Sequence, residues 1–274
     1  MLSYTQYKPS GTLANYIECY WICRGPLITT APVERLIPGG RTEMILNFGH
    51  PMQFMAPDEL SDGKAISGAH IMGQRNRIYY ARQNGDTDLL GVRFKPGGVS
   101  AFTKLPLSNL LNQIIPAEYV LGDSLKDWEN RLTEKKNDAD KIYLLDTLIM
   151  QITKGTTTEW TSVCKAVETI RKDKPVSVNA LCNENESYYK KLERAFMKYV
   201  GYTPKSYCRI VRFNRAIRQM QINKKSLTSV CYDCDYYDQS HFIKDFRQFT
   251  GTAPKHFQVE NHSIAMFLIS QQAV

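Results

Sequence analysis

The sequence contains no hydrophobic run long enough to cross a membrane, no cysteine pattern typical of disulfides, and only five histidines in 274 residues. A transmembrane helix needs about 20 consecutive apolar residues, whereas the longest candidate covers only residues 264–269. Residues 1–12 lack the basic segment and apolar run of a secretory signal. We therefore expect a soluble, cytoplasmic protein that has no membrane partner.

The cysteines and histidines also argue against a metal site. Seven cysteines are scattered along the chain, and Cys231 and Cys234 have C-x-x-C spacing without the second pair of ligands that a structural zinc requires. Only His50 and His70 precede residue 241, so a catalytic metal would have to recruit a carboxylate such as Glu43. We predict free thiols, no metal, no cofactor and no catalytic residue.

The positive charge of the chain is confined to one region. The formal net charge is +8, and residues 165–262 contain 18 Lys and Arg against 10 Asp and Glu. The rest of the chain contains 17 residues of each sign. Such an asymmetry indicates a polyanionic partner for one region only, and nucleic acid is the commonest polyanion.

Residues 1–100 have the pattern of short strands joined by tight turns. Residues 42–48 and 89–94 are apolar and β-compatible, and glycine and proline recur at short intervals, for example at Gly49 and Pro51. This pattern predicts a small barrel or sandwich with turns at these interruptions.

Helical periodicity follows. Residues 124–133 and 139–153 are predicted helices, and the second carries an apolar stripe that includes Leu145. The stripe could pair two protomers as a homodimer, transmit a signal, or pack against the chain's own barrel. Residues 154–158 are the best linker candidate, so we expect one domain at 1–154 and a helical domain at 159–260.

The helical region contains an internal repeat. Gly201 and Pro204 recur fifty residues later as Gly251 and Pro254. Each copy consists of a short helix, a turn and a longer helix that ends before the glycine. This is the plan of the helix-turn-helix motif, whose second helix enters the major groove of DNA. The two copies therefore predict two DNA-reading units in tandem.

Capping residues define the helices of these units. In the first copy Ser177 can cap the short helix, and the longer helix covers about residues 187–199. In the second copy Ser226 caps the short helix and Asp238 caps a helix at about 239–249.

A linker helix at 204–221, with Thr203 as its cap and proline at its first position, is predicted to join the units. Its arginines recur every three residues, so they wind around the helix, and we expect some to meet phosphate and others to pair with acids. They are Arg209, Arg212, Arg215 and Arg218.

The longer helix of each unit has an apolar inner face and a cationic, hydrogen-bonding outer face. At 100° per residue, Phe196 lies on the inner face of the first helix and Phe246 on that of the second. Lysine and arginine can pair with guanine or phosphate, and glutamine with adenine. The predicted DNA-contacting residues are Lys190, Lys191, Arg194 and Lys198 on the first helix, and Gln239, Ser240, Lys244 and Arg247 on the second.

These motifs resemble the C-terminal domain of the AraC/XylS family of bacterial transcription regulators, over about residues 165–258 and most specifically over 230–254. One departure is Asp235, at a turn position that is usually glycine. The resemblance implies base-facing positions at Lys190, Glu193 and Arg194, and at Gln239, Ser240 and Lys244.

Residues 37–47 and 91–98 are similar to the cupin-like sensor domains that are fused to this module. The resemblance implies a small-molecule effector or dimerisation, and RNA polymerase as a partner if the protein is an activator. We therefore predict an α+β chain: a mainly β, barrel-like (cupin-like) N-terminal domain followed by helices, then an all-α domain with two helix-turn-helix units joined by a linker helix. The predicted function is sequence-specific binding of double-stranded DNA by an effector-controlled transcriptional regulator.

Two alternatives stay open. A cupin-like barrel could carry a metal and act as an enzyme. The protein could also be a thiol-based redox sensor that uses Cys19 with Cys23, or Cys231 with Cys234.

Overall fold

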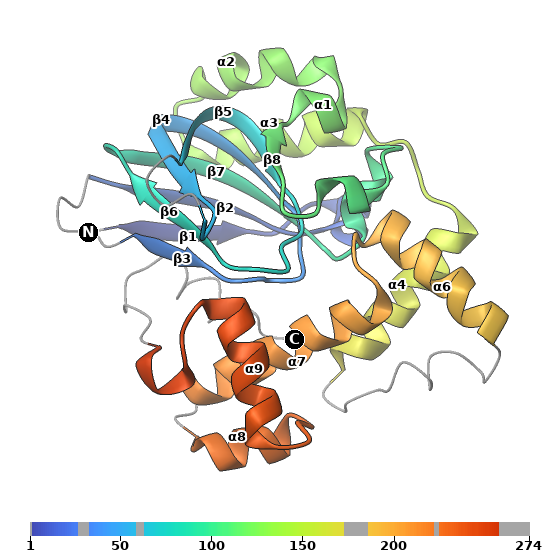
Figure 1. The fold of residues 1–274 in the computed structure, drawn as a ribbon. Helices are drawn as coiled ribbons and strands as arrows, with labels where there is room; N and C mark the ends of the chain where they lie inside the picture. Colours follow the sequence, from blue (N-terminus) through green and yellow to red (C-terminus); the bar gives the residue numbers. More distant parts are fainter. Residues whose placement is uncertain (1, 27–32, 59–62, 173–185, 222–224, 258–274) are drawn as a thin grey trace.

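The computed structural model describes residues 2–26, 33–58, 63–172, 186–221 and 225–257. A bent antiparallel sheet, covered by helices on one side, lies above a group of helices formed by the C-terminal half of the chain (Figure 1). We call these the sheet part and the helical part. The predicted α+β class is confirmed. No helix among the described residues is long and apolar enough to span a membrane.

The described strands of the sheet part form one eight-stranded sheet in the order β1-β2-β7-β4-β5-β8, with β6 added to β4 and β3 to β6. Their bounds are β1 Ser3–Tyr7, β2 Ile17–Gly25, β3 Glu34–Leu36, β4 Glu43–Met55, β5 Lys64–Met72, β6 Tyr79–Gln83, β7 Thr87–Phe94 and β8 Ile114–Pro116. The first half of β4 pairs with β7 and its second half with β6. The long β4 therefore belongs to two groups of strands, which gives the sheet a barrel-like form.

The turn predicted at Gly49 and Pro51 is wrong, because β4 continues through both residues. The register between β4 and β5 shifts after Asn47. The Asn47 side chain makes local backbone contacts here: its oxygen accepts a hydrogen bond from the Gly49 N–H at 3.0 Å, and its amide donates to the His50 carbonyl at 3.0 Å. Glycine and proline within a strand mark an irregularity in this case rather than its end.

Helices α1 (Glu118–Leu121), α2 (Trp128–Thr133) and α3 (Asp138–Gln151) cover the outer face of the sheet (Figure 1). The helix predicted at 124–133 is split into a 3₁₀ turn and α2. The apolar stripe of α3, including Leu145 and Leu148, packs in the same core cluster as Tyr20 and Val92 of the sheet. The stripe is therefore covered by the chain's own sheet and is not available to pair two protomers.

The helical part contains α4 (Thr158–Arg171), α6 (Glu186–Tyr199), α7 (Pro204–Gln221), α8 (Leu227–Asp233) and α9 (Gln239–Thr250). The predicted caps Thr203, Ser226 and Asp238 are confirmed, since each side chain accepts a hydrogen bond from the backbone N–H three residues later, at 3.1, 3.3 and 2.7 Å. The short helix predicted after Ser177 lies outside the described residues.

The turn between α8 and α9 requires a left-handed residue. Asp235 has a φ of 57° there, at the position where the resemblance implied glycine. Aspartate tolerates this conformation better than most residues because its short polar side chain can hydrogen-bond locally. The second unit therefore keeps its turn without the glycine.

Leu145→Ala is expected to lower the free energy of unfolding by about 2–5 kcal/mol, because truncation of a buried leucine leaves a cavity. Leu145 is completely buried, whereas Tyr143 on the same helix is 77% exposed. Tyr143→Ala is the control and should change stability by no more than about 0.5 kcal/mol. Urea unfolding gives both values. Equal, small effects for the two variants would contradict the packing of α3 on the sheet.

Asp235→Val is expected to destabilise the helical part by about 1–2 kcal/mol, because left-handed backbone is unfavourable for a β-branched residue. Asp235→Asn preserves the tolerance for this conformation and should stay within about 0.5 kcal/mol of the parent. Thermal unfolding monitored by circular dichroism compares the two. An equal loss for both would mean that the carboxylate, and not the backbone angle, determines the effect.

Candidate nucleic-acid interface

Helix α6 presents the predicted division into two faces. Phe196 and Tyr199 are buried, and Leu192 is half-buried against the same cluster. The predicted DNA-contacting residues of this helix lie away from that face: Lys190, Lys191, Arg194 and Lys198 are exposed, and Glu193 is half-buried.

Lys198 differs from the other cations of α6 because it already has partners within the chain. Its ammonium lies 3.3 Å from the Glu159 carboxylate at the start of α4 and 4.6 Å from the centre of the Tyr199 ring. Hydrogen bonds from the Tyr199 hydroxyl and from Lys198 lower the pKa of the Glu159 carboxyl. The ion pair between Lys198 and Glu159 therefore connects α6 to α4.

Helix α9 shows the same division. Phe242, Phe246 and Phe249 are buried, and Phe249 packs on Phe213 of α7 with ring centroids 4.9 Å apart. The predicted outer residues Gln239, Ser240, Lys244 and Arg247 are all exposed. The Gln239 amide donates a hydrogen bond to the Thr228 hydroxyl of α8 at 3.0 Å. This bond holds the Gln239 side chain, at the start of α9, against α8.

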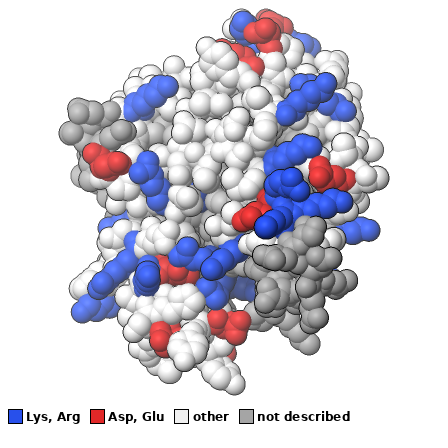
Figure 2. Space-filling model, turned by 45° about the vertical axis from the view of Figure 1, so that its right-hand side comes forward, with Lys and Arg blue, Asp and Glu red and all other residues white. Residues whose placement is uncertain are grey.

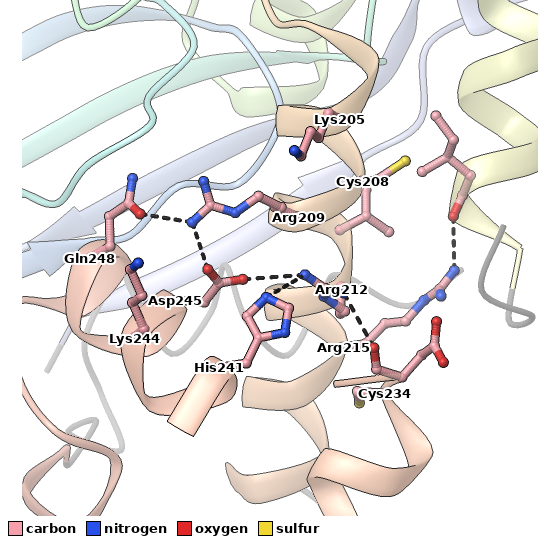
Figure 3. Close-up of a pocket in the computed structure, with 13 residues that line it drawn as sticks. Lys205, Cys208, Arg209, Arg212, Arg215, Cys234, His241, Lys244, Asp245 and Gln248 are labelled. Atoms are coloured by element: carbon pink, nitrogen blue, oxygen red, sulfur yellow. Dashed lines mark hydrogen bonds and ion pairs between the residues drawn. The ribbon is translucent and has the colours of Figure 1, made fainter. Parts of the chain in front are cut away.

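A buried carboxylate fastens α9 to the linker helix α7 (Figure 3). Asp245 is 1% exposed and accepts a hydrogen bond from Arg209 at 2.6 Å. The guanidinium of Arg212 lies 3.5 Å from its other oxygen. Arg209 also donates to Gln248 of α9 at 2.8 Å. A charge-assisted bond of this kind fixes both distance and orientation, so α9 is held in one position on α7.

Arg212 and Arg215 also contact backbone carbonyls. Arg212 donates to the Asp235 carbonyl at 3.3 Å and lies 4.5 Å above the Tyr236 ring, which holds the turn of the second unit. Arg215 donates to the Ile170 carbonyl at 3.0 Å and to the Lys172 carbonyl, at the end of α4. The prediction that some of these arginines pair with acids is confirmed for Arg209 and Arg212.

Asp245 was not singled out from the sequence, although a signal was present. On a helical projection it falls beside Phe242 and Phe249, on the inner face of α9. A carboxylate on an apolar face needs a cationic partner, and the closely spaced arginines of the linker helix could supply one.

The sheet part is joined to the helical part by hydrogen bonds from α4 and from the residue segment that follows α6. The Tyr202 hydroxyl, just beyond α6, donates to the Arg75 carbonyl at 2.5 Å. The Trp160 indole of α4 donates to the Gly97 carbonyl at 2.9 Å. Burial raises the pKa of Tyr202 and lowers that of the Arg75 guanidinium. These polar groups are therefore shielded from solvent by the contact between the two parts.

The sheet part also touches the linker helix and the second unit. A Cβ atom at Gly40 would lie 3.3 Å from the Tyr207 ring of α7, and one at Gly251, after α9, would lie 3.2 Å from the Tyr80 hydroxyl. Gly251 has a φ of 72° and ends α9. Both reading units and the helix between them thus rest on one end of the sheet part.

Basic side chains are spread over the surface. In Figure 2, groups of Lys and Arg side chains lie on the upper, middle and lower parts of the face shown, with Asp and Glu among them. The positive charge on this face is therefore divided among several groups.

The interior of the sheet part contains an ion pair. Arg93, which is 1% exposed, donates to the Glu43 carboxylate at 2.6 Å. Burial lowers the pKa of His70 to about 4. Glu43 therefore already has a cationic partner, and across the described stretches of the chain no group of three potential ligands is placed to hold a metal ion.

The cysteines of the proposed thiol pairs are buried and free. Burial raises the pKa of Cys19 and of Cys234 to about 11 and that of Cys23 to about 12. These groups are thus protonated at neutral pH. Because the thiolate is the reactive form, the two pairs lack the usual property of redox-sensing cysteines.

Two family models match the chain. Residues 181–259 match a "Helix-turn-helix domain" family, and residues 5–116 match a "Domain of unknown function (DUF6597)". The helix-turn-helix match includes all of α6, α7, α8 and α9.

Curated relatives match a part of the chain. The HTH-type transcriptional activator RhaS of Pectobacterium carotovorum is 33% identical over 64 residues, 23% of each chain. The HTH-type transcriptional regulator ArgR of Pseudomonas aeruginosa is 30% identical over 66 residues, 24% of this chain and 20% of its own. The chain thus spans less than a quarter of the length of these relatives.

Solved structures similar to the chain include ToxT of Vibrio cholerae, with 10% identity, 98% of this chain and 97% of ToxT covered, and a TM-score of 0.43. An apo form of a ToxT variant has 9% identity, covers 91% and 97%, and has a TM-score of 0.46.

The motifs that resemble AraC/XylS regulators, the helix-turn-helix match and the regulator relatives agree. The chain carries, over residues 181–259, a helix-turn-helix domain that is similar to those of AraC/XylS regulators.

Proposed function

We propose that the protein is a sequence-specific DNA-binding transcriptional regulator, with α6 and α9 as reading helices in successive major grooves. The observation that carries the proposal is the pair of helices, each with buried aromatic residues on one face and exposed cations or amides on the other. The linker helix α7 has 18 residues and so spans about 27 Å. This length is compatible with reading heads spaced by about one turn of DNA, 34–36 Å.

The bases would be read by residues on the outer faces of both helices, all of them exposed except the half-buried Glu193. The first set is Lys190, Glu193 and Arg194, with Lys191 and Lys198 at its flanks; the second is Gln239, Ser240 and Lys244, with Arg247 beside it. Because Lys198 pairs with Glu159, we assign it to the phosphate backbone rather than to a base.

We further propose that residues 1–154 form a sensor domain for a small-molecule effector and that residues 159–260 form the DNA-binding domain. The sheet part contacts both reading units at one of its ends, so a ligand that alters this end can change the spacing of α6 and α9. One relative is named as a transcriptional activator and another as a transcriptional regulator. If this protein is also an activator, we propose that it contacts RNA polymerase. A homodimer would use a surface other than the covered stripe of α3.

The proposal is tested with the full-length protein and a pool of random duplex DNA at about 150 mM salt, close to physiological ionic strength. We expect enrichment of an asymmetric motif with two short conserved blocks about one helical turn apart. Retention without enrichment, lost steeply as salt rises, would indicate only non-specific electrostatic binding and would contradict sequence-specific regulation.

Lys244→Ala is expected to change the base preference within one of the two blocks, because Lys244 lies on the outer face of α9. Loss of a good base contact reduces discrimination by about 1–3 kcal/mol. Binding to the enriched motif and to its single-base variants measures this. An even loss of affinity across all variants would show instead that Lys244 contacts phosphate.

A further inference from the structure

A cationic cleft lies beside the contact between α9, the second reading helix, and the linker helix α7. Its volume is about 720 Å³, and it is bounded by α7, α9 and the end of α4 (Figure 3). Five basic side chains line it against two acidic ones, Asp235 and Asp245. The basic side chains are Lys205, Arg209, Arg212, Arg215 and Lys244.

The position of the cleft relates it to the path of DNA. The major groove is about 12 Å wide and a helix with its side chains about 10–12 Å across. The sugar–phosphate backbone must therefore run along both flanks of a reading helix that lies in the groove. The side of α9 that carries Asp245 and Gln248 is one wall of the cleft, and it faces α7, whose Arg209 contacts both residues.

We infer that this cleft receives the DNA backbone between the two major-groove segments, and that Lys205 of α7 contacts a phosphate there. The inference rests on the proposed function and adds to it a binding site on the linker helix, outside both reading helices. The class of ligand is a phosphodiester of duplex DNA.

The cleft is suited to a backbone rather than to a base. Asp245 neutralises only one of the two guanidiniums that hold it, Arg209 and Arg212. Arg215 donates to carbonyls and keeps its full charge. These arginines are held by contacts within the chain, so they supply a fixed positive field that does not depend on sequence. Lys205 is exposed in the first turn of α7, and its long side chain can reach a phosphate.

The internal repeat supplies a matched control. Lys205 follows Pro204 in the first copy, and Lys255 follows Pro254 at the equivalent position of the second. Both lysines are exposed, but only Lys205 lines the cleft. The two substitutions Lys205→Gln and Lys255→Gln therefore remove the same charge from equivalent positions, one inside the cleft and one outside it.

The experiment measures how affinity depends on salt, for the full-length protein, Lys205→Gln and Lys255→Gln, with the enriched duplex and with random duplex DNA. Loss of one phosphate contact reduces the slope of log K against log salt by about 0.9. We expect this reduction for Lys205→Gln, with a loss of affinity of about fivefold at 150 mM salt that is similar on both duplexes. Lys255→Gln should keep the parent slope. Equal thermal unfolding temperatures confirm that both variants fold.

A second measurement locates the phosphate. Neutral methylphosphonate linkages, placed one at a time along the enriched duplex, should weaken binding of the parent at a position between the two conserved blocks. The same linkage should have no further effect on Lys205→Gln.

The outcomes separate the two levels of the proposal. Suppose that the unsubstituted protein binds a specific motif and that Lys205→Gln has the same salt slope. The proposed phosphate site in the cleft is then wrong, and the proposed role of α6 and α9 as reading helices is unaffected. A slope reduced equally by both substitutions also overturns the site, because the effect would then be one of net charge. If the parent selects no motif, the proposed function itself fails.

Discussion

The carboxylate of Asp245 is the constraint on which the geometry of the second reading unit depends. It is buried between α9 and α7, 2.6 Å from Arg209 and 3.5 Å from Arg212. An ion pair of this kind contributes little net stability, but an unpaired buried charge is strongly unfavourable. The pairing therefore selects one orientation of α9 on α7. The aromatic cluster around Phe213 alone would tolerate small rotations, because apolar contacts are not directional.

The same arginines connect the turn, the reading helix and the cleft. Arg212 holds the carbonyl of Asp235, whose left-handed conformation forms the turn, and also approaches Asp245. Because both contacts involve the same guanidinium, a change in one of them alters the geometry of the other. The cleft therefore belongs to the scaffold that positions α9, and its positive field is fixed before any DNA approaches. A preorganised field of this kind requires little rearrangement upon binding.

The contact between the sheet part and the helical part is the second constraint. It combines close backbone approach, at Gly40 and Gly251, with hydrogen bonds such as that from Tyr202 to the Arg75 carbonyl. Interfaces between domains of one chain are more polar than obligate interfaces, and relative motion is their usual property. An interface that touches α6, α7 and the end of α9 is in a position to alter all three together.

The sequence by itself determined the features that depend on neighbours in the chain. Caps at Thr203, Ser226 and Asp238 and the inner aromatic faces follow from spacings of one to four residues, and the structure contains all of them. The left-handed position of Asp235 was implied by the family resemblance, and the structure has it as well. The same local reasoning failed at Gly49 and Pro51, because β4 continues through both residues although its pairing with β5 is interrupted between Asn47 and Met52. Whether the stripe of α3 faces a second protomer or the chain's own sheet was equally undecided.

Only the tertiary structure decided which distant residues meet. Arg209 and Asp245 are 36 residues apart, and Lys205 reaches the same cleft as Lys244 only because α7 and α9 pack side by side. Periodicity states which face of a helix is buried, but it carries no information about the partner or the angle of packing. Those depend on the combined fit of many side chains. For this reason the pairing of Asp245 with Arg209 and Arg212, the cleft and the contact between the two parts could be seen only in the folded chain.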